Sequence, residues 1–299
     1  MIVVEVEFTE WTDDGLLRHP SLIATRDDKP AGEVTREVAM SAVRGVTITN
    51  AERVVYPELG LTKLDVARYL EAVAPLMLPH VVGRPLTFVR CPEGVSGECF
   101  FQKHWTGKLP DALETETIRQ SDGNRKPYVV LRDVEGLVTL AQWGILEVHV
   151  WSCRADSVES PDRIVFDLDP GEGVAWKEVR AGAIAVRDAL AARGLESWLK
   201  TSGGKGLHIV APIERRSTWT DLGEFAGDVA DELVRSRPDR FISVASKAER
   251  SGKIFVDWLR NSRGATWVAP WSMRARPDAG VSVPIPWERL GRVRAGNQD

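Results

Sequence analysis

Apolar and polar positions recur with two different periods along the chain, and together they predict a mixture of helices and strands. In "KLDVARYLEAVAPL", residues 63–76, apolar side chains repeat at helical spacing, and Thr62 is a plausible N-cap. Further elements follow the same two patterns: helices over 175–193 (ending at Gly194) and around 221–236, and strands over 196–202, 206–212 and 253–259. The mixture predicts an α/β or α+β fold with a central sheet.

The stretch "RIVFDLDPGEG", residues 163–173, combines an apolar run with two aspartates. If the strand reaches residue 169, its period of two places Asp167 and Asp169 on one face, and Phe166 and Leu168 on the other, toward a core. Two carboxylates about 7 Å apart along one strand face can converge on a pair of divalent cations. The alternative is a strand end with a solvated aspartate and a turn aspartate.

Residues 1–40 differ from the rest of the chain. "VVEVEFTEW" alternates as a strand, and "LLRHPSLIATRDDKPAGEV" predicts a strand followed by a polar segment with Pro and Gly. We expect a linker near residues 28–42 and a compact domain over 41–299.

Composition places the chain among ordinary globular proteins: of 299 residues, 43% are hydrophobic and 27% are charged. No apolar run is long enough to span a membrane, and the acidic N-terminus is unlike a signal peptide, so we expect a cytoplasmic protein without a membrane partner. Cys91, Cys99 and Cys153 are odd in number and lack a C-x-x-C spacing, which predicts reduced thiols rather than a disulfide framework or a zinc site.

Charge is spread unevenly along the chain. The formal net charge is -4, yet between Arg235 and Arg276 ten Lys or Arg residues face only three acidic ones. Such a basic segment can bind a ligand that carries phosphates, although scattered surface arginines would give the same count.

A glycine-rich loop with a lysine lies in "WLKTSGGKGLHIVAPI", residues 198–213. Paired glycines allow successive backbone N–H groups to form an anion-binding nest, and Lys205 adds a point charge between the flanking Ser202 and His208. The order of residues is not that of a Walker A motif. A plain hairpin turn is the alternative.

A third stretch, "RSGKIFVDWLRN", residues 250–261, places Asp257 in a strand among basic residues. An Asp-x-Asp strand, a glycine–lysine loop, a further strand aspartate and an arginine excess together suit one reaction. Carboxylates that hold two hard cations can activate a 3′-hydroxyl and neutralise a triphosphate during nucleotidyl transfer.

Several of these motifs resemble the polymerase domain of bacterial ATP-dependent DNA ligase D, of the archaeo-eukaryotic primase superfamily. The resemblance lies in "FDLDP", "KTSGGKGLHI", "KIFVDWLRN" and "ATWVAPWSMRARPDAGVSVPI", extends to "FFQKHW" and "NAERVVYPELGLTK", and covers about 43–290. It implies a primase-polymerase fold, with central mixed or antiparallel sheets flanked by helices. It also implies gap filling and end addition of nucleotides, favouring ribonucleotides, at DNA double-strand breaks during non-homologous end joining.

The resemblance also assigns roles to residues. Asp167, Asp169 and Asp257 would bind two divalent cations, Mn²⁺ or Mg²⁺, and form the catalytic centre. The triphosphate of an NTP or dNTP would be held by Ser202, Lys205, His208, Arg274 and Arg276. Phe100 and Phe101 would stack on template bases or on the nucleotide base, with core packing as the alternative. The 5′-phosphate of a downstream DNA strand would be held by Arg53 and Lys63. Lys63 stands at the start of the helix that begins near Thr62, where free N–H groups and a partial positive charge would also favour an anion.

At some positions the expected role is less defined. Arg53 stands where relatives often carry Lys, which keeps the charge. Arg260 stands where some relatives carry Gln, which leaves its contact open. His149, in "EVHVW", is a candidate for the pocket, and a satisfied core histidine is an equal alternative.

The first residues resemble the C-terminal end of the OB-fold of an ATP-dependent DNA ligase, so the parent chain is expected to carry a ligase domain before the polymerase. The implied partners are DNA ends and gaps with a 5′-phosphate, that ligase domain and a Ku-type end-binding protein, in the bacterial nucleoid. No K-x-D-G motif for ligase chemistry occurs here. Two alternatives remain: a haloacid-dehalogenase-like phosphatase, which also places D-x-D after a strand, and a non-catalytic module that binds DNA ends.

Overall fold

The structure is a computed structural model that describes residues 2–8, 10–11, 16–28, 30–33 and 41–294. The chain divides into two compact units, Met1–Ala39 and Met40–Asp299. Much of the linker expected near residues 28–42 lies outside the described residues. Among those described, no helix is both long and apolar enough to cross a membrane.

The first unit contains short antiparallel strand pairs. Strand β1 (Val4–Glu7) pairs with β4 (Ser21–Thr25), and β2 (Glu10–Trp11) pairs with β3 (Leu17–Arg18). A 3-10 turn, η1 (Ala31–Glu33), follows. Strand structure is therefore present in "VVEVEFTEW" and "LLRHPSLIAT", but each stretch holds two short strands where one was expected.

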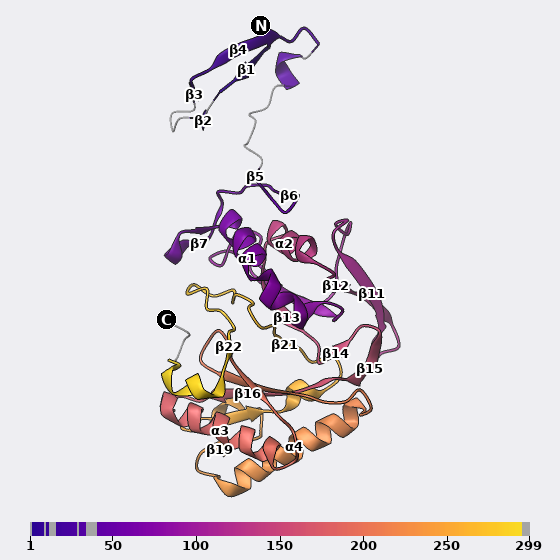
Figure 1. Ribbon diagram of the computed structural model, residues 1–299, viewed down its shortest axis with the longest axis vertical. Coiled ribbons are helices and arrows are strands. Elements are labelled where there is room, and N and C mark those ends of the chain that lie inside the picture. The colour runs from indigo at the N-terminus through magenta and orange to yellow at the C-terminus, as the bar shows by residue number, and fades with distance from the viewer. Residues whose placement is uncertain (1, 9, 12–15, 29, 34–40, 295–299) are drawn as a thin grey trace. The chain divides into compact units, whose positions relative to one another are not determined.

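The second unit is built on two six-stranded sheets (Figure 1). The first sheet is antiparallel, with β10 pairing at the side of β9. In spatial order its strands are β11 (Glu114–Arg119), β12 (Arg125–Val130), β9 (Leu86–Arg90) with β10 (Phe100–Gln102), β13 (Ile145–Val150) and β21 (Trp267–Val268).

Two helices, α1 (Lys63–Val81) and α2 (Val134–Gln142), pack with this sheet around a common core. Thr62 is the N-cap of α1: its hydroxyl accepts a hydrogen bond from the Asp65 N–H, and the Asp65 carboxylate accepts one from the Thr62 N–H. This capping box confirms the predicted start of the helix. Short hairpins precede it: β5 (Ser41–Val43) with β6 (Val46–Ile48), and β7 (Val54–Tyr56) with β8 (Leu61–Thr62), which flank η2 (Pro57–Leu59).

The second sheet carries the Asp-x-Asp strand at its centre. Its pairings are antiparallel except between β19 and β20. In spatial order its strands are β19 (Phe241–Ile242), β20 (Ile254–Asp257), β16 (Arg163–Pro170), β18 (Leu207–Pro212), β17 (Trp198–Thr201) and β22 (Pro284–Ile285). The remaining short elements are β14 (Cys153–Arg154), β15 (Ser157–Pro161), η3 (Lys247–Glu249), η4 (Leu259–Asn261) and η5 (Trp287–Arg292).

The two faces of the second sheet have different neighbours. Phe166 and Leu168 belong to the core shared with α3 (Trp176–Ala191) and α4 (Trp219–Ser236), whereas Val165 belongs to the core of the first sheet. Figure 1 shows α3 and α4 on the outer side of the second sheet. Since side chains alternate along a strand, Asp167 and Asp169 share Val165's face, between the two sheets. This confirms the predicted facing of the two aspartates.

One sequence-based prediction about the cysteines is wrong. The structure joins Cys91 and Cys99 in a disulfide, while Cys153 is free and buried. The reason is the pairing of β9 with β10, in which Arg90 is opposite Phe100, so that the two cysteines follow at the open end of the same ladder. Cys91 and Cys99 are therefore oxidised to a disulfide in this fold, and they are not reduced thiols.

Candidate functional site

Three carboxylates converge between the sheets. Asp167 and Asp169 lie on β16, and Asp257 lies on the neighbouring β20, directly opposite Asp167 in the strand register. One carboxylate oxygen from each residue lies within 4.8 Å of the other two. Asp167 and Asp257 are buried, whereas the Asp169 side chain is 45% exposed. The arrangement is a compact acidic cluster with one open side.

The three carboxylates perturb each other electrostatically. Burial and the charges of Asp167 and Asp257 raise the pKa of Asp169 to about 7. Burial raises the pKa of Asp257 as well, against the opposing effect of Arg260. Burial alone would also raise the pKa of Asp167, but His208, Arg260 and Lys200 more than offset it and hold that pKa at about 2. Because burial lowers the pKa of His208 to about 4, this imidazole is neutral at pH 7 and lends Asp167 less than a full charge.

The donor set fits divalent cations. Asp167 Oδ1 is buried and has no hydrogen-bond partner among the described residues, although His208 Nε2 lies 3.2 Å away. A hard cation, which prefers oxygen ligands, would stabilise such a cluster, in which one carboxylate has a free, buried oxygen and the other two have a raised pKa. Asp167, Asp169 and Asp257 are therefore the residues that could hold a metal here.

Two arginines partly neutralise the cluster. Arg260 Nε lies 3.0 Å from Asp257 Oδ2, and its Nη2 lies 3.8 Å from Asp167 Oδ2. On the other side, Arg250 Nη1 lies 3.7 Å from Asp169 Oδ2. The contact of Arg260, which the sequence left open, is thus with the carboxylates themselves.

The glycine–lysine loop is a hairpin connection between β17 and β18 that also borders the cluster. Ser202 N donates to Gly206 O, and Gly206 N donates to Ser202 Oγ, both at 3.0 Å. Gly206 cannot be replaced without movement, because a Cβ there would lie 2.6 Å from Leu168 O. Lys205 is exposed at the tip of the loop, and Ser202 is buried at its base.

This loop and the carboxylates line one cavity of about 410 Å³. Its lining brings together most of the residues expected to hold a nucleotide: Asp167, Asp169, Ser202, Lys205, His208, Arg274 and Arg276, with His149, Arg250 and Arg260. Asp257 does not line it and lies beside Asp167 on the neighbouring strand β20. A cavity rimmed by four arginines and a lysine has the charge to hold a polyphosphate beside the acidic cluster.

A buried ion network positions Arg274. Glu147 is 4% exposed, and its Oε2 lies 2.9 Å from Arg274 Nε and accepts a hydrogen bond from Ala275 N. Its Oε1 lies 2.7 Å from His149 Nε2. Burial favours the neutral acid, but the combined effect of these partners is larger and lowers the pKa of Glu147 to about 2. Arg274 Nη1 donates to Ser202 O at 2.5 Å, which ties the network to the hairpin.

His149 is therefore paired on one nitrogen and free on the other. Its Nδ1 is buried without a hydrogen-bond partner among the described residues, and its ring lines the cavity. His149 thus combines features of both alternatives: Nε2 is paired, as in a satisfied core histidine, and the ring also lines the cavity, as a pocket residue would.

The two phenylalanines of β10 are exposed, Phe100 at 41% and Phe101 at 47%, so neither is packed in a core. Because neighbouring side chains in a strand point to opposite faces, Phe100 and Phe101 contact different residues. Phe101 contacts the His149 ring edge-on, with centroids 5.4 Å apart, whereas Phe100 lies near the Arg90 guanidinium at 5.9 Å. Phe101 therefore packs against His149, whose ring lines the cavity at the carboxylates, without lining that cavity itself.

Arg53 and Lys63 line a separate cavity of about 210 Å³, together with Arg90 and Gln142. Lys63 Nζ donates to Thr49 O at 2.9 Å and to Gln142 Oε1 at 2.8 Å. Arg53 Nη1 donates to Pro92 O and to Glu93 Oε1. Burial, and then the charge of Arg53, lower the pKa of Lys63 to about 8.

The sequence predicts free N–H groups at the N-terminus of α1, and this prediction is wrong. Lys63 N donates to Arg53 O, Leu64 N donates to Ala51 O, and the capping box satisfies Asp65 N. An anion here would be held by the cationic side chains instead.

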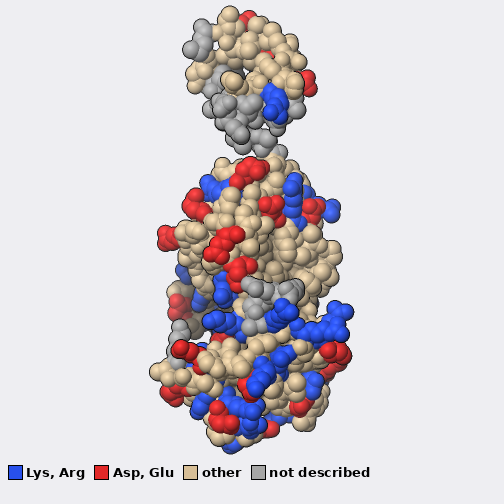
Figure 2. Space-filling view, turned by 90° about the vertical axis from the view of Figure 1, so that its left-hand side faces the viewer, with Lys and Arg blue, Asp and Glu red and all other residues tan. Residues whose placement is uncertain are grey.

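On the face shown in Figure 2, Lys and Arg side chains gather around the level of the second sheet, and acidic ones are more frequent above it. Part of the basic segment from Arg235 to Arg276 is used in ion pairs: Arg263 with Glu159, Arg240 with Glu178 and Arg237 with Asp239. Arg250, Arg260, Arg274 and Arg276 instead reach the cavity at the carboxylates. The excess of Lys and Arg in this segment thus consists partly of scattered surface charges and partly of residues that line the cavity.

Sequence reasoning missed Glu147, Arg250, Arg90 and Lys200 as parts of these sites. Lys200 is 3% exposed and lies beside His208 in the strand register. For Glu147 a signal existed: a glutamate inside the apolar strand "ILEVHV" is costly unless it is paired. Arg250 and Arg90 carried no signal beyond their charge.

A family model described as "LigD, primase-polymerase domain" matches residues 62–298. The multifunctional non-homologous end joining protein LigD of Pseudomonas aeruginosa is 37% identical to this chain, over 98% of the chain and 37% of that protein. The multifunctional non-homologous end joining DNA repair protein LigD of Mycobacterium tuberculosis is 39% identical, over 82% of the chain and 33% of that protein. The chain thus spans about a third of the length of these curated relatives.

A solved structure, the polymerase domain from Mycobacterium tuberculosis ligase D in complex with DNA, superimposes with a TM-score of 0.79 at 37% identity. The match covers 84% of this chain and 90% of that one. Together with the two antiparallel-rich sheets and their helices, it confirms the predicted fold class.

Proposed function

Because this chain belongs to the LigD primase-polymerase family, we propose that it adds nucleotides to DNA 3′ ends, filling gaps and extending ends at double-strand breaks. The observation that carries the proposal is the convergence of Asp167, Asp169 and Asp257 beside a basic cavity of about 410 Å³. Family membership removes the haloacid-dehalogenase-like phosphatase as a candidate. A non-catalytic DNA-end module would have no use for this acidic cluster.

In the proposed reaction the 3′-oxygen of a primer joins the α-phosphorus of a nucleoside triphosphate, pyrophosphate leaves and the hydroxyl proton is released. Asp167, Asp169 and Asp257 would hold two divalent cations, Mn²⁺ or Mg²⁺. When bound, these cations activate the hydroxyl and neutralise charge on the phosphates. Arg260 and Arg250, which now face the carboxylates, would then be free to turn toward phosphate oxygens.

The remaining roles follow from position. Ser202, Lys205, Arg274 and Arg276 would grip the triphosphate, since their donors surround the cavity. His208 lies opposite Asp167 on β18, with its Nε2 3.2 Å from Asp167 Oδ1, and would hold that carboxylate in place while its ring borders the phosphates.

Phe101, which packs against the cavity residue His149, would stack on the nucleotide base or on the template base opposite. Phe100 faces away and would stack on DNA nearer Arg90. Arg53 and Lys63 would bind the 5′-phosphate of the downstream strand.

The names of the relatives refer to non-homologous end joining and, for the solved structure, to DNA. We extend this to the present chain: its substrates would be broken DNA ends, and its partners a ligase domain and a Ku-type end-binding protein. The preference for ribonucleotides implied by the family resemblance is part of the proposal.

The test is primer extension on a duplex with a short gap and a downstream 5′-phosphate, run with Mn²⁺ or Mg²⁺ and with ribo- or deoxynucleotides. We expect template-directed addition with at least one metal, faster with ribonucleotides. No addition with either metal would overturn the polymerase assignment, and equal rates with both sugars would overturn the ribonucleotide preference.

A further inference from the structure

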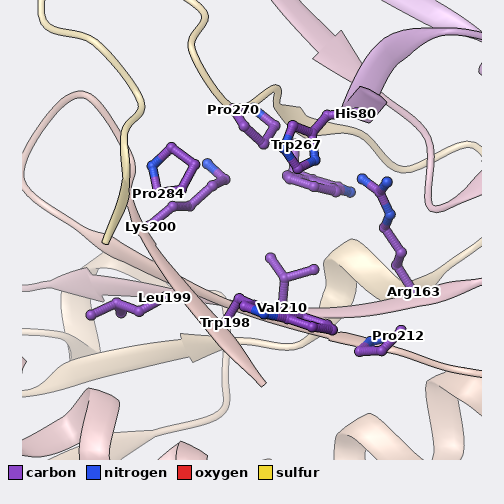
Figure 3. Close-up of a pocket in the computed structure, with 10 residues that line it drawn as sticks. All are labelled: His80, Arg163, Trp198, Leu199, Lys200, Val210, Pro212, Trp267, Pro270 and Pro284. Atoms are coloured by element: carbon purple, nitrogen blue, oxygen red, sulfur yellow. The ribbon is translucent and has the colours of Figure 1, made fainter. Parts of the chain in front are cut away.

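A second cavity, of about 330 Å³, lies on the same face of the second sheet as the carboxylates but farther along the strands (Figure 3). In the register of β16 and β18, Asp167 is opposite His208, Val165 is opposite Val210, and Arg163 is opposite Pro212. The cavity occupies the rows of Val210 and Arg163. Its lining is completed by His80, Trp198, Leu199, Lys200, Trp267, Pro270 and Pro284.

The walls are mostly apolar and include two indoles. Figure 3 shows Trp267 and Trp198 on opposite sides of the space, with the Val210 side chain between them in this view and the prolines toward the sides. Trp198 is 53% exposed, so the cavity is open to solvent along that ring. Two aromatic faces across a gap favour a flat, apolar ring system.

One cation in this cavity lacks an acidic partner. Arg163 makes no hydrogen bond or ion pair with an acidic side chain among the described residues, and its guanidinium lies 5.9 Å from the Trp267 ring centroid. Burial, and then the charge of Arg84, lower its pKa to about 10, so it stays charged at pH 7. A half-buried guanidinium without an acidic partner can pair with a carboxylate through two N–H groups.

The other polar groups of the cavity are already engaged or neutral. Lys200 Nζ donates to Ser282 Oγ at 2.6 Å and to Thr201 O at 3.4 Å. Burial lowers the pKa of His80 to about 4, so its ring carries no charge at pH 7. The cavity therefore presents one available positive charge within aromatic and apolar walls.

Trp267 separates this cavity from the acidic site. Its ring lines both cavities, its centroid is 6.3 Å from that of His208, and its Nε1 donates to Ser152 Oγ at 3.0 Å. An occupant of the second cavity would touch the side chain that packs against His208, opposite Asp167.

We propose that this cavity is a binding site for a small aromatic monocarboxylate, whose ring lies between Trp198 and Trp267 and whose carboxylate pairs with Arg163. Its occupant acts on the nucleotide site through Trp267. This second statement rests on the proposed function, whereas binding itself does not.

The test is calorimetric titration of the protein, without DNA or nucleotide, with 2-naphthoate and with its neutral analogue 2-naphthamide. We expect 2-naphthoate to bind at least about tenfold more tightly than 2-naphthamide, because the amide lacks the one charged contact with Arg163. Arg163→Gln should remove this difference, and Arg216→Gln, whose side chain is 86% exposed outside the cavity, should keep it.

A second variant, which fills the cavity with a larger side chain, tests the site even if Arg163→Gln fails to fold. Val210→Phe should abolish binding of both compounds while the melting temperature stays near that of the wild type. No binding of 2-naphthoate at millimolar concentration, equal binding of the amide, or unchanged binding by Val210→Phe would overturn the site. If 2-naphthoate binds but leaves the KM for the incoming nucleotide unchanged, the action through Trp267 is wrong although the site stands.

Discussion

Replacing both Arg53 and Lys63 by Ala should remove a preference for gaps whose downstream strand carries a 5′-phosphate. Both side chains line the cavity of about 210 Å³ and are held there by oxygen acceptors on neighbouring loops and on α2. A terminal phosphate carries about one more negative charge near pH 7 than an internal one. Both cations therefore favour the phosphorylated substrate over the hydroxyl one.

The structure sets the size of the effect. A hydrogen bond to a charged group contributes about 1.5–3 kcal/mol. Both contacts fall short of that range, because the Arg53 side chain is 33% exposed and already pairs with Glu93, and Lys63 has to share its donors with Gln142. About 1 kcal/mol each, or about 2 kcal/mol together, corresponds to roughly a thirtyfold loss of affinity for the phosphorylated gap. Because the N–H groups at the start of α1 are satisfied within the protein, no backbone contribution remains after the substitutions.

The same pocket predicts a pH dependence. The pKa of Lys63 is lowered to about 8, so the charged form dominates at pH 7 and is lost as the pH rises through and above 8. The phosphate preference should therefore fall between pH 7 and pH 9, while the phosphate keeps its second charge throughout. Lys63→Arg should hold the preference constant over this range, because a guanidinium stays protonated.

The assay is titration of gapped duplexes with a 5′-phosphate or a 5′-hydroxyl, followed by fluorescence anisotropy. A control variant with Arg68 and Arg132 replaced by Ala removes two exposed cations outside the cavity and should lower affinity equally for both substrates. The reasoning is refuted if the wild type shows no phosphate preference, if the double variant at the cavity retains it, or if the preference rises with pH.

Three further predictions concern the first unit, the disulfide and a buried amide. Removing residues 1–35 should leave primer extension and the melting temperature nearly unchanged, because those residues form a separate compact unit; a large drop in either would show that they stabilise the polymerase unit. Replacing Cys91 and Cys99 by Ser should weaken the 5′-phosphate preference, though less than the double variant does, because the loop that they close positions the acceptors of Arg53; an unchanged ratio of affinities in the same anisotropy assay would contradict this. Asn261→Ala should cost about 3 kcal/mol in urea unfolding, because it leaves the buried N–H and C=O of Val165 without their partners; a cost under about 1 kcal/mol would mean that water replaces the amide.

Local patterns predicted the parts of the site that lie within one element. The period of two along β16 places Asp167 and Asp169 on one face, and the capping residues mark the start of α1. No local pattern could place Asp257 opposite Asp167, since 90 positions of chain separate them and the pairing depends on the order of strands in the sheet. That step came from the family resemblance.

The errors have the same physical origin. The disulfide depends on the pairing of β9 with β10, which places Cys91 opposite Cys99 and which a cysteine count does not reveal. The start of α1 was expected to offer free N–H groups, but segments that the chain brings alongside it satisfy them. Glu147 was overlooked because its partners, Arg274 and Ala275, lie more than a hundred positions away. Each case requires tertiary pairing, which hydrophobic periodicity does not encode.

Single-turnover primer extension by Asp167→Asn and Asp257→Asn tests the central claim most directly, with DNA affinity measured in parallel. Asparagine keeps the shape. At Asp257, whose pKa burial raises, loss of the charge should not weaken folding, whereas at Asp167, whose pKa is lowered to about 2, it removes a favourable charge, so the melting temperature of each variant is measured as well. We predict that each variant loses at least about a hundredfold in rate and keeps its affinity for DNA, while Asp239→Asn, at an exposed acid of the same basic segment, stays at the wild-type rate. Extension by either variant near the wild-type rate would contradict the assignment of these carboxylates to the catalytic metals.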